Sequence, residues 1–464
     1  MRKLTVLIVL ILLVVAAGGT GVVWDQAGRV AGPVIVFTEP ATVGRIGEFV
    51  MTIETPRGEL NSLEVTLEQN GATLPVFSLS GGDTSALVRE GSDRLVLRQP
   101  LGKERFESLL QGPASIAVTA ARPVLFGYRE AETAAGHDFE VSLRPPLLGV
   151  QSQFHYVNHG GSEVVVYRVT PADAVSGVRV GEHEYPGFPA AGAGMEGADP
   201  SIHVAFLALL WDQELATPIT VFARDSLGNE ASATFAYRTF AQQFRESRIN
   251  LSDGFFANVV PAILQNSPDF RVDDPSDLLA SYLSINRDMR RENDAYIAAL
   301  SRETSPEILW QGPFKQLINT AVESGFADQR DYYYDGEVVD HQTHLGFDLA
   351  STVAAPVLAA NRGRVVHSGW LGIYGNCVIL DHGMGLQSLY AHLSSVDVGE
   401  GDLVELDEQL GRSGATGLAG GDHLHFTMLL NGNAITPIDW WSAQWVEDRI
   451  LRKFREAGEP AAAL

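Results

Sequence analysis

Cysteine is almost absent from this sequence of 464 residues, where it occurs once, at position 377. A single cysteine cannot form a disulfide within the chain, so the fold has to rest on hydrophobic cores. With 45% hydrophobic residues, the chain is long enough for several domains that each bury a core. Cys377 lies in a strand-like segment, where we expect a small, buried, apolar side chain.

Positive charge is also scarce, because 33 lysines and arginines stand against 57 acidic residues and the formal net charge is −24. The basic residues form no cluster along the chain. A protein that binds nucleic acid needs a basic patch or stripe to meet the phosphates. The composition therefore excludes nucleic acid as a partner.

A long apolar run occurs only at the start of the chain, at residues 4–24. About 20 apolar residues span a bilayer as a helix. Arg2 and Lys3 precede the run and the next basic residue is Arg29, which favours an N-terminus in the cytoplasm and export of the rest. We predict a single-pass helix in the inner (cytoplasmic) membrane, with the remaining chain on the periplasmic, extracytoplasmic side.

A cleaved signal peptide is the alternative for this run. Residues 4–15 would form its apolar region, and Ala16, Ala17 and Gly18 offer a site with small residues for cleavage. The apolar run continues past these residues to Trp24, which favours the retained anchor. The protein is exported in both cases, and after cleavage it would be secreted to the periplasm.

Residues 28–240 are rich in strand signals. Residues 63–68 alternate between apolar and polar side chains, and the run ends at Asn70-Gly71, a strong hairpin signal. Short strands separated by turns predict two β-sandwiches, at 28–146 and 147–240. The second closes with a hairpin at residues 219–237 that resembles those of bacterial immunoglobulin-like domains. We interpret both as spacers or as modules that bind other envelope proteins.

Five residues with metal-binding or proton-transferring side chains gather in the last third of the chain. They are His344, Asp348, His392, His423 and His425. A catalytic zinc site uses three protein ligands of this kind and leaves one position open, and further histidines can move protons at neutral pH. The group therefore indicates a metallohydrolase.

The spacing of these residues supports their convergence. Side chains along a strand alternate between faces, so His423 and His425 point the same way if the apolar segment 423–429 is a strand. His344 and Asp348 are also an even number apart, and Gly346 between them leaves room for a close approach. His392 lies in a mostly apolar segment, where a histidine without a function would cost desolvation energy.

Several segments in this region resemble the lysostaphin-like, LytM-type zinc metallopeptidases, which are peptidoglycan endopeptidases with a duplicated hybrid motif fold. They are HLGFDLA (344–350), GNCVILDHG (375–383), LYAHLS (389–394), GATG (414–417) and HLHF (423–426). The resemblance covers about residues 311–442. It implies an antiparallel β-sheet domain at 311–445 that acts on peptidoglycan peptides.

The resemblance also implies the roles of the five residues. His344, Asp348 and His425 match the family's ligands for Zn2+, and His392 and His423 match its two catalytic histidines, of which either could be the base. The loop 418–422 and the tyrosine-rich segment 331–335 depart from the family's usual pattern. Those departures concern the shape of the groove and remove no ligand.

Two other functions are compatible with such a domain. One is a non-catalytic regulator, because some LytM-type domains have lost their zinc ligands and activate other wall hydrolases. The other is a scaffold for an envelope complex, in which catalysis is secondary. All five positions are present here, which favours an enzyme.

Residues 241–310 carry apolar side chains at helical spacing after a capping signal at Ser276 or Asp277. We interpret this segment as a helical linker, with a gate over the groove as the alternative. Residues 446–464 are expected to form a tail that includes a short charged helix. The sequence as a whole thus predicts a mainly β, multidomain protein with an N-terminal transmembrane helix, two immunoglobulin-like sandwiches, a helical linker and a C-terminal peptidase.

Overall fold

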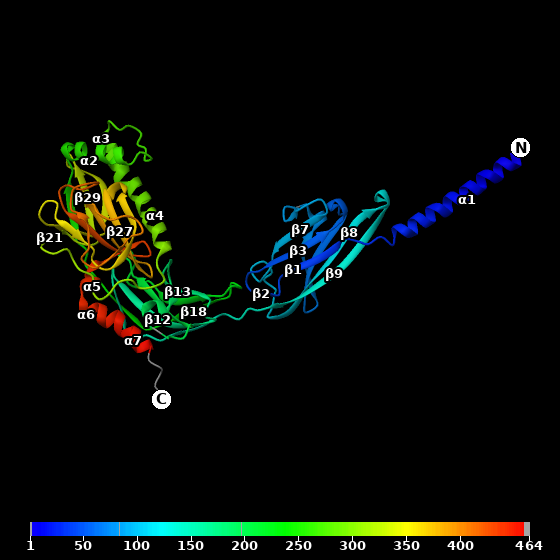
Figure 1. The fold of residues 1–464 in the computed structure, drawn as a ribbon, viewed down its shortest axis with the longest axis horizontal. Coiled ribbons are helices and arrows are strands. Elements are labelled where there is room, and N and C mark those ends of the chain that lie inside the picture. Colours follow the sequence, from blue (N-terminus) through cyan, green and yellow to red (C-terminus); the bar gives the residue numbers. More distant parts are fainter. Residues whose placement is uncertain (1, 83, 196, 459–464) are drawn as a thin grey trace, which may run out of the picture. The chain divides into compact units, whose positions relative to one another are not determined.

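The computed structural model describes residues 2–82, 84–195 and 197–458. They form two compact units, one made of Met1–Pro145 with Arg224–Glu230 and the other of Pro146–Ala223 with Ala231–Leu464. Both units are mainly β (Figure 1), which confirms the expected class. The immunoglobulin-like topology and the domain boundaries given above stay predictions.

The chain begins with helix α1, Arg2–Ala27, which is the apolar run expected from the sequence. Its segment Leu4–Ala27 is long and apolar enough to cross a membrane, and none of the most hydrophobic stretch is buried. A signal sequence meets the same criterion, so both interpretations of this segment remain.

Two sheets pack face to face in the first unit, because the alternating apolar residues of each fill one shared core. Phe49 and Met51 of one sheet and Leu63 and Val65 of the other are completely buried in it. The expected turn at Asn70-Gly71 is confirmed, with φ of 50° and 80° at these two residues. The sheets have the orders β1-β3-β7-β6 and β2-β9-β8-β4-β5, with strands β1 Val34–Glu39, β2 Thr42–Val43, β3 Glu48–Glu54, β4 Ser62–Gln69, β5 Ala72–Ser78, β6 Leu87–Arg89, β7 Arg94–Pro100, β8 Gly112–Val124 and β9 Arg129–Val141.

The second unit begins with three small sheets whose apolar residues form a core around Val164, Val166 and Phe206. Their orders are β10-β12-β16-β15, β14-β13-β17-β18 and β11-β19, with strands β10 Leu147–Val150, β11 His155–Asn158, β12 Ser162–Thr170, β13 Val175–Val180, β14 His183–Pro186, β15 Phe188–Pro189, β16 Ile202–Ala208, β17 Ile219–Arg224, β18 Glu230–Thr234 and β19 Tyr237–Phe240.

A helical segment follows. Ser252 caps α2 (Asp253–Asn266) and Asp277 caps α3 (Leu278–Ser284), each accepting a hydrogen bond from a backbone N–H in the first turn. A π-helical turn, Ile285–Met289, joins α3 to α4 (Arg290–Leu300). The buried carboxylate of Asp340 fixes this turn, because it accepts hydrogen bonds from Asn286 and Arg287 at 2.8 Å each.

The C-terminal part is built on one antiparallel sheet with the order β21-β24-β32-β28-β27-β26-β30, in which β33 pairs with β32. Smaller sheets, β20-β22-β23 and β25-β31-β29, flank it, and three short helices end the chain. The strands are β20 Glu246–Asn250, β21 Ala321–Ser324, β22 Asp328–Tyr334, β23 Glu337–His344, β24 Phe347–Ala350, β25 Pro356–Leu358, β26 Gly363–Trp370, β27 Asn376–Gly383, β28 Leu386–Leu393, β29 Ser395–Val396, β30 Leu403–Val404, β31 Gln409–Arg412, β32 Leu424–Leu430 and β33 Asn433–Ile435, and the helices are α5 Pro437–Trp441, α6 Ala443–Val446 and α7 Arg452–Gly458.

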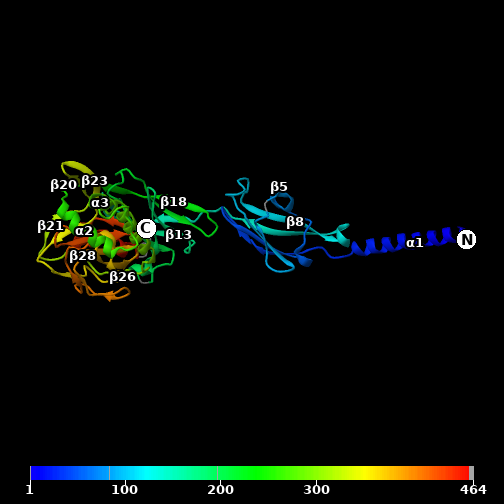
Figure 2. The same ribbon diagram turned by 90° about the horizontal axis from the view of Figure 1, so that it is seen from above.

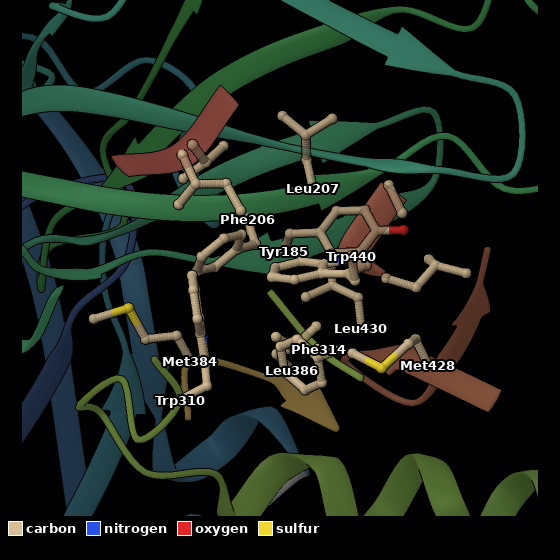
Figure 3. Packing of buried hydrophobic residues seen from close by; sticks show 14 of the residues in the cluster. Tyr185, Phe206, Leu207, Trp310, Phe314, Met384, Leu386, Met428, Leu430 and Trp440 are labelled. Atoms are coloured by element: carbon tan, nitrogen blue, oxygen red, sulfur yellow. The ribbon is translucent and has the colours of Figure 1, made fainter. Parts of the chain in front are cut away.

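The small sheets of the second unit and this C-terminal part share a single hydrophobic core (Figure 3). Trp440 lies at its centre, 5.9 Å from the ring of Phe206 and with its indole N–H donating to Ser162 Oγ at 3.1 Å. Lys453 and Glu163 form an ion pair at 2.7 Å in which neither side chain is more than 3% exposed. Removing one partner of such a pair would leave a buried, uncompensated charge.

Candidate metal centre

Three strands bring His344, Asp348 and His425 together. His344 ends β23, Asp348 lies in β24, and His425 lies in β32 directly opposite Asp348 in the register of the sheet. One ligand atom from each residue lies within 4.8 Å of the other two, as in a metal site. The expected strand at 423–429 is confirmed as β32, and His423 immediately precedes it.

The hydrogen bonds of the two imidazoles fix where their protons are. His344 Nδ1–H donates to the carbonyl oxygen of Gly325 at 3.1 Å, so Nε2 carries a lone pair. Thr427 donates its hydroxyl proton to Leu345 O and therefore accepts from His425 Nε2–H at 3.0 Å, which leaves the lone pair on His425 Nδ1. These two nitrogens face each other at 2.9 Å. A metal ion bound by both nitrogens, or a proton shared between them, makes this arrangement favourable.

Asp348 completes the group of ligand atoms. Its Oδ1 lies 2.9 Å from His344 Nε2 and 3.1 Å from His425 Nδ1. Its Oδ2 accepts a hydrogen bond from Arg330 Nη2 at 3.0 Å, and Oδ1 is the oxygen that faces the two imidazoles. Burial raises the pKa of this carboxyl, but the three surrounding histidines outweigh burial and hold its pKa well below the usual range when they carry protons in place of a metal.

His392 and His423 lie beside this group, with their ring centroids 4.9 Å apart. His392 Nδ1–H donates to the carbonyl oxygen of Thr416 at 2.7 Å, which leaves a lone pair on Nε2. Burial, together with the charges of His423 and His425, lowers the pKa of His392 to about 3, so this ring is neutral at physiological pH. Burial would also lower the pKa of His423, but Asp348, 3.4 Å from its Nε2, and the carbonyl of Gly421 raise it.

Gly346 allows the strands to approach each other at the site. A Cβ at this position would lie 2.5 Å from His425 Nε2, where no side chain fits. The chain from His344 to Asp348 is not one extended strand, because β23 belongs to the sheet with β22 whereas β24 pairs with β32. The two side chains converge although the chain bends between two sheets there.

The metal-binding group opens into a cavity of about 470 Å³ that the helical segment helps to line. One wall comes from this segment, through Phe255, Tyr282 and Arg290. The lining also includes the loop residues Leu418 and Gly421, whose sequence departs from the usual family pattern. Residues 241–310 therefore do more than connect two parts of the chain, because they shape the space in front of the candidate site.

The model of peptidase family M23 matches residues 342–437, a range that holds all five site residues. Residues 342–437 form a peptidase family M23 domain. The name implies a metal, and the three converging ligand atoms of the M23 domain suit one.

Several characterised proteins are similar to the M23 domain. The DD-carboxypeptidase/endopeptidase Mpg of Neisseria meningitidis is 39% identical over 122 residues, which are 26% of this chain and 27% of that protein. The peptidoglycan DD-endopeptidase ShyB of Vibrio cholerae is 32% identical over 114 residues, 25% of this chain and 26% of that protein. The chain thus spans about a quarter of the length of the curated relatives it matches. The catalytic domain of lysostaphin from Staphylococcus simulans is 28% identical over 26% of this chain and 92% of that domain, with a TM-score of 0.23.

The other residues considered from the sequence lie outside the metal-binding group of the M23 domain. His382 is buried and hydrogen-bonded to Arg362 O and Ser388 Oγ, which gives it a structural role. Cys377 is free and buried, as expected. Of the three consecutive tyrosines, Tyr332 lines the cavity, Tyr333 lies under the guanidinium of Arg248, and Tyr334 donates to Asp253.

Nothing in the sequence points to Arg330, which contacts the candidate ligand Asp348 from outside the matched range. Besides Asp348, its guanidinium donates to Ser324 Oγ at 2.8 Å and contacts Asp328 at 3.4 Å. Arg330 lies two residues after the start of β22, a position that carries no metal-binding signal by itself. Its role depends on the packing of β22 beside β24, which the spacing of residues does not reveal.

We expect Arg330→Lys and Arg330→Gln to weaken metal binding by about 10- to 100-fold, the usual effect of removing a group that orients a metal ligand. Both substitutions break the fixed geometry that holds Asp348 Oδ2 and turns Oδ1 toward the histidines. Competition with a fluorescent chelator on the full-length protein measures the affinity. Arg291→Gln is the matched control, because Arg291 is exposed and paired only with Asp288 among the described residues. Unchanged affinity in both Arg330 variants would contradict this role.

Proposed function

We propose that this protein is a zinc-dependent metalloendopeptidase that hydrolyses peptide bonds of peptidoglycan during cell-wall remodelling. The observation that carries the proposal is the convergence of two lone-pair nitrogens and one carboxylate oxygen beside two further histidines. The named activities of Mpg and ShyB support the substrate class.

Zinc is the metal that suits this set of ligands. Two imidazoles and one carboxylate are a familiar catalytic zinc set, with a fourth position left for water or substrate. Both histidines also donate their second N–H to an oxygen, at Gly325 and Thr427, which is how zinc-binding imidazoles are usually oriented. His344, Asp348 and His425 would hold the ion.

Zinc, when bound, polarises the scissile carbonyl and makes a water molecule more acidic. His392 presents its Nε2 lone pair to this space and accepts the proton of the attacking water, since its Nδ1–H is committed to Thr416. His423 retains a proton more readily because Asp348 is close, so it is suited to stabilise negative charge on the former carbonyl oxygen and to protonate the leaving amine. The cavity wall formed by the helical segment would orient the peptide.

The position of the protein in the envelope follows from the same proposal. Helix α1 would be retained as a single-pass anchor in the inner membrane, with the M23 domain in the periplasm, where peptidoglycan lies. Other envelope proteins would bind to the two β regions. A non-catalytic regulator needs none of the five side chains, whereas here all five are present and lie close together.

Zinc analysis and digestion of purified sacculi test the proposal together. We expect the full-length protein in detergent to hold one zinc ion and to release soluble peptide fragments from sacculi, because its ligands and its proton-transferring groups are complete. Chelation should stop the release and added zinc should restore it. A protein that holds zinc but leaves both sacculi and cross-linked peptides intact would contradict the enzyme and favour the regulator.

A further inference from the structure

The hairpin between β8 and β9 ends in an apolar tip with highly exposed aromatic side chains. The segment reads Pro-Val-Leu-Phe-Gly-Tyr at residues 123–128 and is flanked by Arg122 and Arg129. Phe126 is 99% exposed and Tyr128 is 81% exposed. Adjacent large apolar side chains that are exposed on a long hairpin usually mark a contact surface, because keeping them in water is costly.

The backbone of the tip directs these side chains outward. Leu125 and Phe126 have φ of 53° and 56°, a region that bulky residues rarely occupy. Strain of this kind is retained where a particular arrangement of side chains is useful. In the tip, the arrangement exposes the ring of Phe126 and does not fold it back on the sheet.

The tip lies against the C-terminal end of α1, within the same unit (Figures 1 and 2). Ala27 of the helix forms a small apolar cluster with Val124 and Ala131 of the hairpin. Arg129 donates to the carbonyl oxygen of Trp24, and its guanidinium lies 5.3 Å from the centroid of the Trp24 ring.

The contact continues along the helix toward its N-terminus. Leu125 and Tyr128 share an apolar cavity with a set of helix residues, Ala16, Gly19, Thr20, Val23 and Trp24. These residues are spaced three, one, three and one apart and therefore form one face of the helix. Most of them are small, which lets another segment approach the helix closely.

The position of this contact along α1 fixes its depth in a membrane. Ala16 precedes Trp24 by eight residues, which is about 12 Å of helix at about 1.5 Å per residue. If residues 4–24 span a hydrocarbon layer of about 30 Å, Trp24 lies at its outer boundary and Ala16 well inside the outer half. Side chains beside Ala16 and Gly19 then lie in lipid.

We propose that the tip of the β8–β9 hairpin is a second membrane contact that inserts Leu125, Phe126 and Tyr128 into the outer leaflet beside α1. Arg122 and Arg129 flank the tip at the level of the lipid phosphates, where guanidinium groups bind well. The insertion relies on apolar area, since the net charge of −24 gives no long-range attraction to an anionic membrane. This inference rests on the proposed membrane anchor.

The scarcity of cysteine allows a direct test by labelling. Cys377 is buried, so Phe126→Cys and Tyr128→Cys each add one accessible thiol to the full-length protein. Val88→Cys is the matched control, because Val88 is an exposed strand residue of the same unit that is not part of the tip. Each variant is labelled with an environment-sensitive fluorophore and placed in phospholipid nanodiscs. We expect the labels at 126 and 128 to shift to shorter wavelength, to lose quenching by aqueous iodide and to be quenched by spin-labelled lipid.

The control label at position 88 should show the opposite pattern, with iodide quenching retained. Labels at 126 and 128 that behave like the one at 88, in a protein that is embedded in the nanodisc, would overturn the inference while the anchor stands. A soluble cellular protein whose sequence starts near Gly18 would overturn the anchor and this inference together. Activity on sacculi is measured separately and depends on neither result.

Discussion

Replacing His392 with alanine should leave the zinc content of the full-length protein unchanged and lower its turnover by about two to four orders of magnitude, the usual contribution of a general acid or base. The structure separates these two effects. His392 is outside the group of three ligand residues, and its Nδ1–H is bound to Thr416 O and not to a ligand of the site. Its loss removes a proton acceptor and no metal ligand. Elemental analysis and the rate of peptide release from sacculi measure the two effects.

His341→Ala is the matched control for this variant. The side chain of His341 is exposed, pairs with Asp331 and does not line the cavity. Both zinc content and turnover should be retained. If His392→Ala loses its zinc together with its activity, His392 belongs among the ligands and the division of roles proposed here is wrong.

His344→Ala and His425→Ala should each abolish tight zinc binding. Structural zinc sites are stabilised by about 10–16 kcal/mol from four ligands, so the loss of one ligand should weaken binding by at least about a hundredfold. The remaining histidine and Asp348 cannot retain the ion during dialysis against a chelator. The metal-to-protein ratio after dialysis measures this effect, and turnover should fall with it.

Thr427→Val provides an intermediate case for the same measurement. It keeps all three ligands but removes the hydroxyl that orients His425 through Nε2. The expected loss of affinity is about 10- to 100-fold, smaller than for a ligand.

Stoichiometric zinc in both His344→Ala and His425→Ala after dialysis would show that the ligands have been wrongly assigned.

The five site residues could be predicted from the sequence more fully than the neighbouring residues that position them. His423 and His425 are two residues apart next to a strand, and strand periodicity alone places them on one side. The role of Gly346 could also be anticipated, because the close approach of His425 needs a residue without a side chain. Arg330 could not be found in this way, since it reaches Asp348 only through the packing of two strands from different sheets.

The helical segment shows a second limit of sequence reasoning. The cap at Ser276 or Asp277 and the periodicity after it were predicted, and the helix start at Asp277 is confirmed. The surface against which these helices pack could not be predicted, because helical spacing identifies an apolar face but not its partner. The attachment combines an apolar cluster that includes Tyr332 and Ile373 with the buried carboxylate of Asp340, and these residues form no pattern along the chain.

The shared core around Trp440 has a practical consequence for the M23 domain. A fragment excised at residues 311–445 would lose Phe206 and Ser162, expose Trp440 to water, and leave Glu163 and Lys453 on separate pieces. Limited proteolysis should therefore yield a resistant fragment that begins near Pro146 and retains Lys453, and soluble expression should require the same ends. In a chimaera made from two relatives, the peptidase and the small sheets that begin near Pro146 would have to come from the same parent, because they share one core.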